Sequence, residues 1–149
     1  MPNGIFNSDI VDKFDYLLVA DDDIDDQELI KDALSDNNLD LQKVKWVNDG
    51  EELMILLNKT TQLPSLILLD LNMPRKDGRK VLSEIKNSIT LKHIPVVIFS
   101  TSESLEDIRD CYELGSNTYI TKPNTYQELV DTIADIMKYW GSRAQIITA

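Results

Sequence analysis

Apolar runs alternate along the chain with segments in which apolar residues recur every three or four positions, and this alternation occurs five times. A short apolar run bounded by turn residues predicts a strand, whereas the three-to-four spacing predicts an amphipathic helix. The predicted strands are 16–20, 44–47, 66–69, 95–99 and 118–121. The last helix is expected from about Thr125 to Trp140, with Leu129, Ile133 and Ile136 on one face.

The strict alternation of strands and helices predicts a parallel sheet with right-handed crossovers. The first, third and fourth strands are apolar throughout, as strands buried on both faces are, whereas the second and fifth contain polar residues. We therefore expect an α/β, flavodoxin-like, doubly wound five-stranded parallel sheet in the order 2-1-3-4-5, with helices on both faces. The length favours one domain, placed at 14–141 between an N-terminal tail (1–13) and a C-terminal tail (142–149).

Composition narrows the class of protein. The formal net charge is −11, and such a field repels phosphate backbones, which argues against direct binding of nucleic acid. No apolar run reaches the length of a membrane span, and the N-terminus lacks the pattern of a signal peptide. With one cysteine and one histidine, a zinc site or a catalytic Cys-His pair is not expected. These features predict a cytoplasmic protein that does not act at a membrane.

Polar side chains follow the strands. Asp21 and Asp22 follow the first strand, Asp70 the third and Ser100 the fourth, and Lys122 comes after the fifth. Ligands of open parallel sheets bind beyond the carboxyl ends of the strands, so we expect these groups to converge on one rim. Two carboxylates ~5 Å apart repel by roughly 3 kcal/mol at an effective dielectric of about 20, so the rim requires a cation or protons.

Magnesium suits this set of oxygen donors, with Asp22 and Asp70 as direct ligands and Asp21 acting through water. Lys122 adds a fixed positive charge, and Ser100 adds a hydroxyl donor. A carboxylate nucleophile, a metal and a cation are together the groups that transfer a phosphoryl group. Because Asp70 ends the central strand between the other groups, it is the expected nucleophile.

Other acids near the rim are read differently. Asp23, Asp25 and Asp26 are interpreted as a solvated turn, with Asp25 or Asp26 capping the next helix. Asp21, Asp23 and Asp25 also resemble the start of a calcium loop. That reading is rejected because Asp26 and Asp32 stand where the loop needs Gly and Glu.

The same residues carry a resemblance to a known family. The chain resembles the response-regulator receiver domains (CheY-like) over about 14–140. The matching motifs are LLVADDD at 17–23, LLDLNMP at 68–74, DG at 77–78, IPVVIFS at 94–100 and YITKP at 119–123. The stretches 69–80 and 23–26 further resemble the single-domain regulators that work with bacterial phytochromes.

This resemblance implies roles for individual residues. Asp70 would be the phosphoacceptor, and Asp21 and Asp22 the acidic pair, with Asp22 the direct ligand of Mg²⁺. The backbone carbonyl of Asn72 would complete the protein's share of the metal shell. Ser100 would supply the hydroxyl that turns toward the phosphoryl group. Lys122 would be the lysine of the family's site, and Tyr119 would be the aromatic switch. A cis Lys122–Pro123 bond is also implied.

The resemblance implies a signalling protein of a two-component system or phosphorelay, not an enzyme with its own substrate. A histidine kinase or a histidine phosphotransfer protein would donate the phosphoryl group. The phosphorylated form would change the face made by the fourth helix, fifth strand and fifth helix, and a protein target would read that face. Tyr139 and Trp140 either anchor a homodimer or simply end an amphipathic helix, and both readings stay open.

Two alternatives belong to other classes. A phosphohydrolase of the haloacid-dehalogenase type also uses an aspartate nucleophile and Mg²⁺, but it needs a second aspartate two positions later. This chain has Asn72 there and no obvious cap insertion. The other alternative is a receiver-like interaction module that no longer takes up phosphate. The presence of Asp21, Asp22, Asp70, Ser100 and Lys122 argues against it.

Overall fold

The computed structural model describes residues 14–147, so the predicted tail at 1–13 and the last two residues lie outside the described part. Twelve elements follow one another. They are β1 (Leu17–Ala20), α2 (Ile24–Asp36), the 3₁₀-helix η1 (Leu41–Lys43), β2 (Val44–Val47), α3 (Gly50–Lys59), β3 (Leu66–Leu69), α4 (Gly78–Lys86), β4 (Val96–Ser100), α5 (Leu105–Leu114), β5 (Thr118–Thr121), α6 (Tyr126–Lys138) and the π-helix η2 (Tyr139–Arg143).

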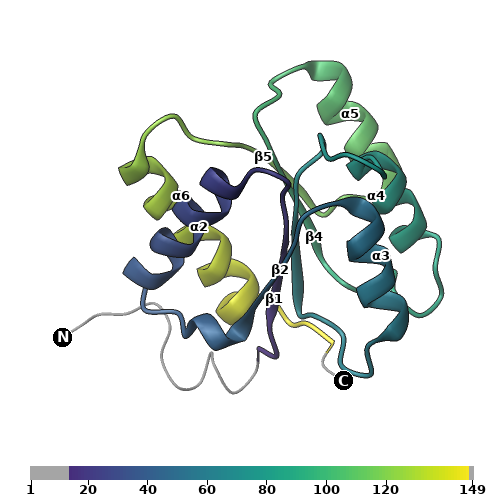
Figure 1. The fold of residues 1–149 in the computed structure, drawn as a ribbon, viewed down its shortest axis with the longest axis horizontal. Helices are drawn as coiled ribbons and strands as arrows, with labels where there is room; N and C mark the ends of the chain where they lie inside the picture. Colours follow the sequence, from purple (N-terminus) through teal and green to yellow (C-terminus); the bar gives the residue numbers. More distant parts are fainter. Residues whose placement is uncertain (1–13, 148–149) are drawn as a thin grey trace.

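The five strands form one parallel sheet in the order β2-β1-β3-β4-β5, which confirms the predicted topology. Every residue of β1, β3 and β4 is buried, whereas the edge strands β2 and β5 are partly exposed. Helices α2 and α6 cover one face of the sheet, and α3, α4 and α5 cover the other (Figure 1). The continuous apolar runs identified the central strands because each is covered on both faces.

The sheet separates two apolar cores. Side chains alternate along β1, so Leu18 and Ala20 pack with α3, α4 and α5, whereas Leu17 and Val19 pack with α2 and α6. The strands between the two helical layers are held from both sides. The carboxyl ends of the strands are therefore held in place, and so are the residues that directly follow them.

Side-chain caps set where the helices begin. The cap of α2 is Asp23, whose carboxylate accepts hydrogen bonds from the backbone N–H groups of Asp25 and Asp26. The prediction that Asp25 or Asp26 caps this helix is therefore wrong. A cap residue has extended backbone angles, as Asp23 does, whereas the other two already lie inside the helix. In the same way, the side chain of Asp49 accepts from the Glu52 amide and caps α3.

The C-terminal part continues past the expected end of α6. The regular helix ends at Lys138 and changes to a π-helix as far as Arg143. Trp140 and Ile146 pack against the core formed with α2 and α6. The division at residue 141 stays a prediction, and contacts with the core extend beyond it.

The start of α4 lies against the loop that follows β3. A Cβ placed on Gly78 would lie 2.5 Å from the carbonyl oxygen of Asp70 and 2.7 Å from the Cα of Leu71. The amide of Gly78 also donates a hydrogen bond to the Leu71 carbonyl. This close approach fixes the backbone that presents Asp70.

We predict that Gly78→Ala lowers the free energy of unfolding by about 2 kcal/mol, because the new methyl group meets backbone atoms that have no room to move. Urea denaturation followed by circular dichroism measures the change. The matched control is Lys80→Ala, an exposed position in the same helix, which should leave stability nearly unchanged. Equal stability of the Gly78 variant and the parent would contradict the prediction.

Candidate functional site

Three carboxylates meet at the carboxyl ends of β1 and β3. One oxygen from each of Asp21, Asp22 and Asp70 lies within 4.8 Å of the others. Asp21 and Asp70 are buried, at 2% and 7% exposure, whereas Asp22 is exposed. The two parallel strands lie side by side, with Ala20 paired to Leu69, so the aspartates that follow them emerge together. The predicted convergence of these acids is therefore present.

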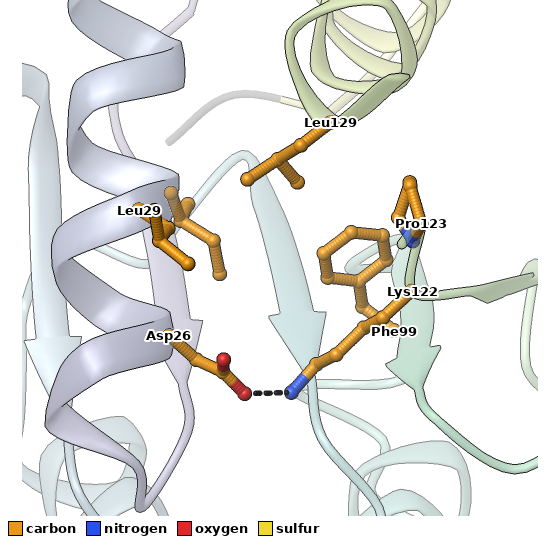
Figure 2. A pocket seen from close by; sticks show the side chains of 7 residues that line it. Asp26, Leu29, Phe99, Lys122, Pro123 and Leu129 are labelled. Atoms are coloured by element: carbon orange, nitrogen blue, oxygen red, sulfur yellow. Dashed lines mark hydrogen bonds and ion pairs between the residues drawn. The ribbon is translucent and has the colours of Figure 1, made fainter. Parts of the chain in front are cut away.

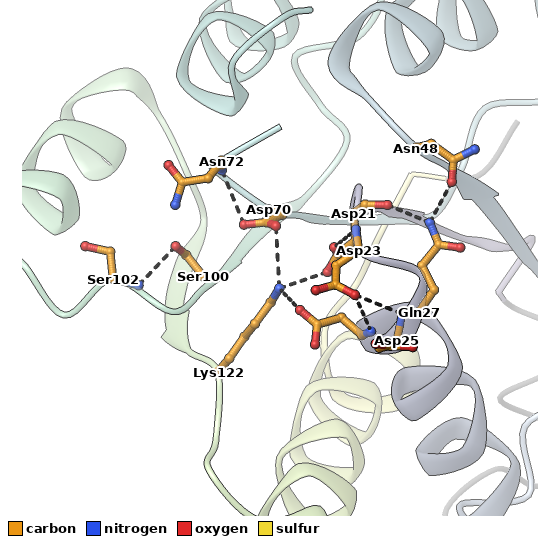
Figure 3. Close-up of polar contacts among 11 residues, drawn as sticks. Asp21, Asp23, Asp25, Gln27, Asn48, Asp70, Asn72, Ser100, Ser102 and Lys122 are labelled. Carbon is orange, nitrogen blue, oxygen red and sulfur yellow. Dashed lines mark hydrogen bonds and ion pairs between the residues drawn. The ribbon is translucent and has the colours of Figure 1, made fainter. Parts of the chain in front are cut away.

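Lys122 reaches the same point from the end of β5 (Figure 3). Its Nζ lies 2.8 Å from Asp21 Oδ2, 2.9 Å from Asp26 Oδ2 and 3.5 Å from Asp70 Oδ2. The lysine side chain is only 11% exposed. Its backbone amide donates to the Ser100 carbonyl at 2.8 Å, which ties the end of β5 to the end of β4. One ammonium thus contacts three carboxylates.

Burial and the neighbouring charges together shift the pKa values of these groups. Burial raises the pKa of Asp70 to about 6; the Lys122 charge opposes the shift and the Asp21 charge adds to it. Burial also raises the pKa of Asp21, although Lys122 donates a hydrogen bond to it. Burial alone would lower the pKa of Lys122, but the hydrogen bond to Asp21 and the charge of Asp70 hold that pKa well above its usual range. A single ammonium therefore leaves the rim short of positive charge.

The donor set fits a hard divalent cation. Carboxylate oxygens are the ligands that Mg²⁺ prefers, and the exposure of Asp22 leaves room for the waters that this ion keeps. The backbone amide of Asn72 donates to Asp70 Oδ1 at 3.3 Å, so this residue adjoins the cluster. That its carbonyl is a metal ligand stays a prediction.

Ser100 and Tyr119 lie beside the rim and contact the loop between β4 and α5. The Ser100 side chain is fully buried, and its Oγ accepts a hydrogen bond from the Ser102 amide at 3.2 Å. The Tyr119 hydroxyl donates to the Ser102 carbonyl at 2.8 Å. Both predicted residues therefore meet at Ser102, although they come from neighbouring strands.

Two polar networks were not found from the sequence. Ser102 Oγ donates to Asp107 at 2.6 Å, and Asp107 pairs with Arg79, which links the β4–α5 loop to α4. The hydrogen bond from Ser102 and the Arg79 guanidinium lower the pKa of Asp107. On the other side, Gln27 Nε2 donates to the Asp21 carbonyl and to Asn48 Oδ1. No spacing signal in the sequence connects these residues.

Asp26 was missed for a different reason. The sequence interpretation placed it in a solvated turn, yet its carboxylate pairs with Lys122. Its position in the first turn of α2, directly after the rim, was the available signal. The lysine partner lies 96 residues away, and only the folded chain brings the two together.

The peptide bond between Lys122 and Pro123 is trans, since no cis bond occurs among the described residues. The expectation of a cis bond is therefore wrong for this structure. The trans form of such a bond is favoured by about 0.5–1 kcal/mol in a free chain.

Comparison with known proteins adds independent findings. The family model described as response regulator receiver domain matches residues 17–134. Response regulator Rcp1 from Synechocystis is 36% identical over 129 residues, covering 83% of this chain and 87% of Rcp1. The crystal structure of the phosphorylated cyanobacterial phytochrome response regulator RcpA gives a TM-score of 0.83 at 39% identity, covering 91% of this chain and 99% of RcpA.

The structure of the Mn²⁺-bound form of Rcp1 gives a TM-score of 0.82 at 34% identity, covering 90% of this chain and 99% of Rcp1. These matches confirm the predicted fold and the resemblance to phytochrome-associated regulators. The carboxylate cluster of this chain supplies the oxygen donors that the expected divalent cation requires. None of the helices in residues 14–147 has the length and hydropathy of a membrane span.

We predict that Asp70→Asn stabilises the metal-free protein by roughly 3 kcal/mol at about pH 8. Burial raises the pKa of Asp70 to about 6 in the folded state, so ionisation costs stability as the pH rises from the unfolded value near 3.8 through that value. The neutral amide avoids this cost. Urea unfolding in EDTA measures the difference, which should vanish below about pH 4, where the parent carboxyl is protonated. A difference independent of pH would contradict this assignment.

Proposed function

Since the chain belongs to the response regulator receiver family, we propose that Asp70 is the residue on which it accepts a phosphoryl group. Receiver domains are the regulated partners in two-component systems, and this chain is one of them. The observation that carries the proposal is the position of Asp70. Its carboxylate is buried at the end of a central strand, within reach of two further carboxylates and one ammonium.

Asp70 has the properties of a nucleophile that works near neutral pH. Burial raises its pKa to about 6, so most of it is ionised at physiological pH while it remains poorly solvated. In the proposed step, one Asp70 oxygen forms a bond to phosphorus while the bond from phosphorus to the donor histidine nitrogen breaks. The Lys122 ammonium, 3.5 Å from Asp70, offsets charge on the phosphoryl oxygens. The Ser100 hydroxyl would donate to one of these oxygens.

Asp22, Asp70 and the Asn72 carbonyl would hold the divalent cation directly, and Asp21 would act through water. We infer that this cation is Mg²⁺, because the ligands are hard oxygens and one side of the cluster is open to water. When bound, the cation neutralises carboxylate charge and orients the incoming phosphoryl group. The Mn²⁺-bound form of the relative Rcp1 supports a divalent ion at this rim.

The partners are part of the proposal. The donor would be a sensor histidine kinase or a histidine phosphotransfer protein. The output face would comprise α5, β5 and α6, and Tyr119 would be its switch, since the tyrosine hydroxyl already contacts the β4–α5 loop. A homodimer through Tyr139 and Trp140, which follow α6 in η2, is also part of the proposal, because Tyr139 is 55% exposed. We place the protein in the cytoplasm, where kinases of this class present their phosphohistidine.

A phosphohydrolase of the haloacid-dehalogenase type is less well supported. The position that would supply its general acid holds Asn72, which has no proton-donating carboxyl group. A module without phosphorylation is also disfavoured, because the carboxylates of Asp21, Asp22 and Asp70 lie close together and Lys122 contacts two of them. We therefore infer that the protein assists its own phosphorylation and dephosphorylation and has no other substrate. Turnover of p-nitrophenyl phosphate would support the phosphohydrolase instead.

We predict that Asp70→Asn abolishes covalent labelling by acetyl phosphate, because the amide is not a competent nucleophile. Phosphate-affinity electrophoresis or intact-protein mass measures the phosphorylated fraction. The control is Asp49→Asn, since asparagine also caps a helix and Asp49 lies outside the cation cluster. Labelling of the Asp70 variant at the parental level would contradict the choice of nucleophile.

We predict that EDTA reduces labelling of the parent at least about tenfold, because uncompensated carboxylates repel the incoming anion. Mg²⁺ or Mn²⁺ should restore the rate, and K⁺ at equal ionic strength should not. The rate of acetyl phosphate labelling measures this dependence. A rate that is insensitive to EDTA would count against the cation site.

A further inference from the structure

We propose that Asp26 is a positioning residue. It gives the Lys122 ammonium a partner outside the cation cluster, so that a divalent cation can take the carboxylates of Asp21 and Asp70 without displacing the lysine from the rim. The inference rests on the proposed function of the same site. It adds a residue that neither the sequence motifs nor the comparisons assign.

The geometry shows competition for the same oxygens. Lys122 Nζ lies 2.8 Å from Asp21 Oδ2 and 3.5 Å from Asp70 Oδ2, and both carboxylates belong to the cluster that would hold the cation. The third partner, Asp26 at 2.9 Å, does not belong to that cluster. A cation that draws on Asp21 and Asp70 therefore leaves Asp26 as an anion for the lysine.

The surroundings of the pair strengthen it. Figure 2 shows the Asp26 carboxylate and the Lys122 ammonium meeting at the edge of a small pocket with apolar side chains around it. The lining residues are Asp26, Leu29, Ile30, Phe99, Lys122, Pro123 and Leu129. Apolar neighbours lower the local dielectric, so this pair is stronger than one in open water.

The position of Asp26 is also fixed on the helix. It lies in the first turn of α2, and its backbone amide donates to the Asp23 carboxylate at 3.3 Å. Its side chain is 34% exposed. The neighbouring Asp25 is about 100° away around the helix and exposed to solvent. Two aspartates of equal charge on adjacent positions thus differ in whether they contact Lys122.

The expected effect on metal binding has one direction. In Asp26→Asn, the ammonium retains only Asp21 and Asp70 as charged partners, so a cation must compete with it for these oxygens. The lost negative charge near the cluster acts in the same direction. Both changes weaken the binding of Mg²⁺. In Asp26→Glu, the charge is retained and the longer side chain can still reach the ammonium.

The test is calorimetric titration of the EDTA-treated, dialysed full-length protein with Mg²⁺ at constant ionic strength. We expect Asp26→Asn to raise the dissociation constant about fivefold, and Asp25→Asn to change it less than about twofold. Asp26→Glu should restore most of the affinity. Circular dichroism and the melting temperature in EDTA report that each variant is folded.

A second set of variants, which all carry Lys122→Met, distinguishes an effect that acts through the lysine from a direct effect of the Asp26 charge on the cation. In Lys122→Met, adding Asp26→Asn should change the dissociation constant no more than Asp25→Asn does. An effect that keeps its full size in this background would overturn the positioning role. Equal affinity of Asp26→Asn and the parent would overturn it as well, while parental labelling of Asp70 would leave the proposed function intact. A parent that binds no Mg²⁺ would contradict both proposals.

Discussion

The Lys122 ammonium contacts three carboxylates, two from the stretch that runs from the end of β1 into α2 and one from the end of β3. The properties of the rim follow from this excess of negative over positive charge. Removing Asp21 and Asp70 from water costs free energy that one cation offsets only in part. The raised pKa of both groups records the remainder. This unbalanced negative charge suits a divalent ion, while burial keeps the Asp70 carboxylate poorly solvated. The sheet holds the charges in place because β1 and β3 are neighbours in register.

The sequence contained most of the fold. Continuous apolar runs identified β1, β3 and β4 as central, because burial on both faces leaves no position for a polar side chain. Once the strand order followed, the general rule about carboxyl ends placed Asp21, Asp70 and Lys122 together. The prediction failed where a helix end depends on backbone angles that residue types do not specify. Asp23, not its neighbours, caps α2, and the regular part of α6 ends two residues early.

The parts of the site that could not be predicted are contacts between side chains of different helices and loops. Whether Asp26 points to solvent or to Lys122 depends on the rotation of α2 relative to β5. That rotation is set by the packing of Ile30, Ala33 and Leu34 in the core, not by the acidic turn itself. The pair of Arg79 and Asp107 depends in the same way on how α4 packs against α5. The spacing of apolar residues identifies the buried face of each helix, but it does not tell which side chain of another element each polar residue will contact.

The division of the interior into two apolar cores has a consequence for substitutions on either side of the sheet. The layer of α2 and α6 carries Asp26 and adjoins Lys122, whereas the layer of α3, α4 and α5 carries Arg79 and Asp107. The sheet lies between the two cores, so the helices of each layer pack mainly on their own side of it. The aspartates at the ends of β1 and β3 lie where the two layers meet, so a change on either side of the sheet can affect the same rim.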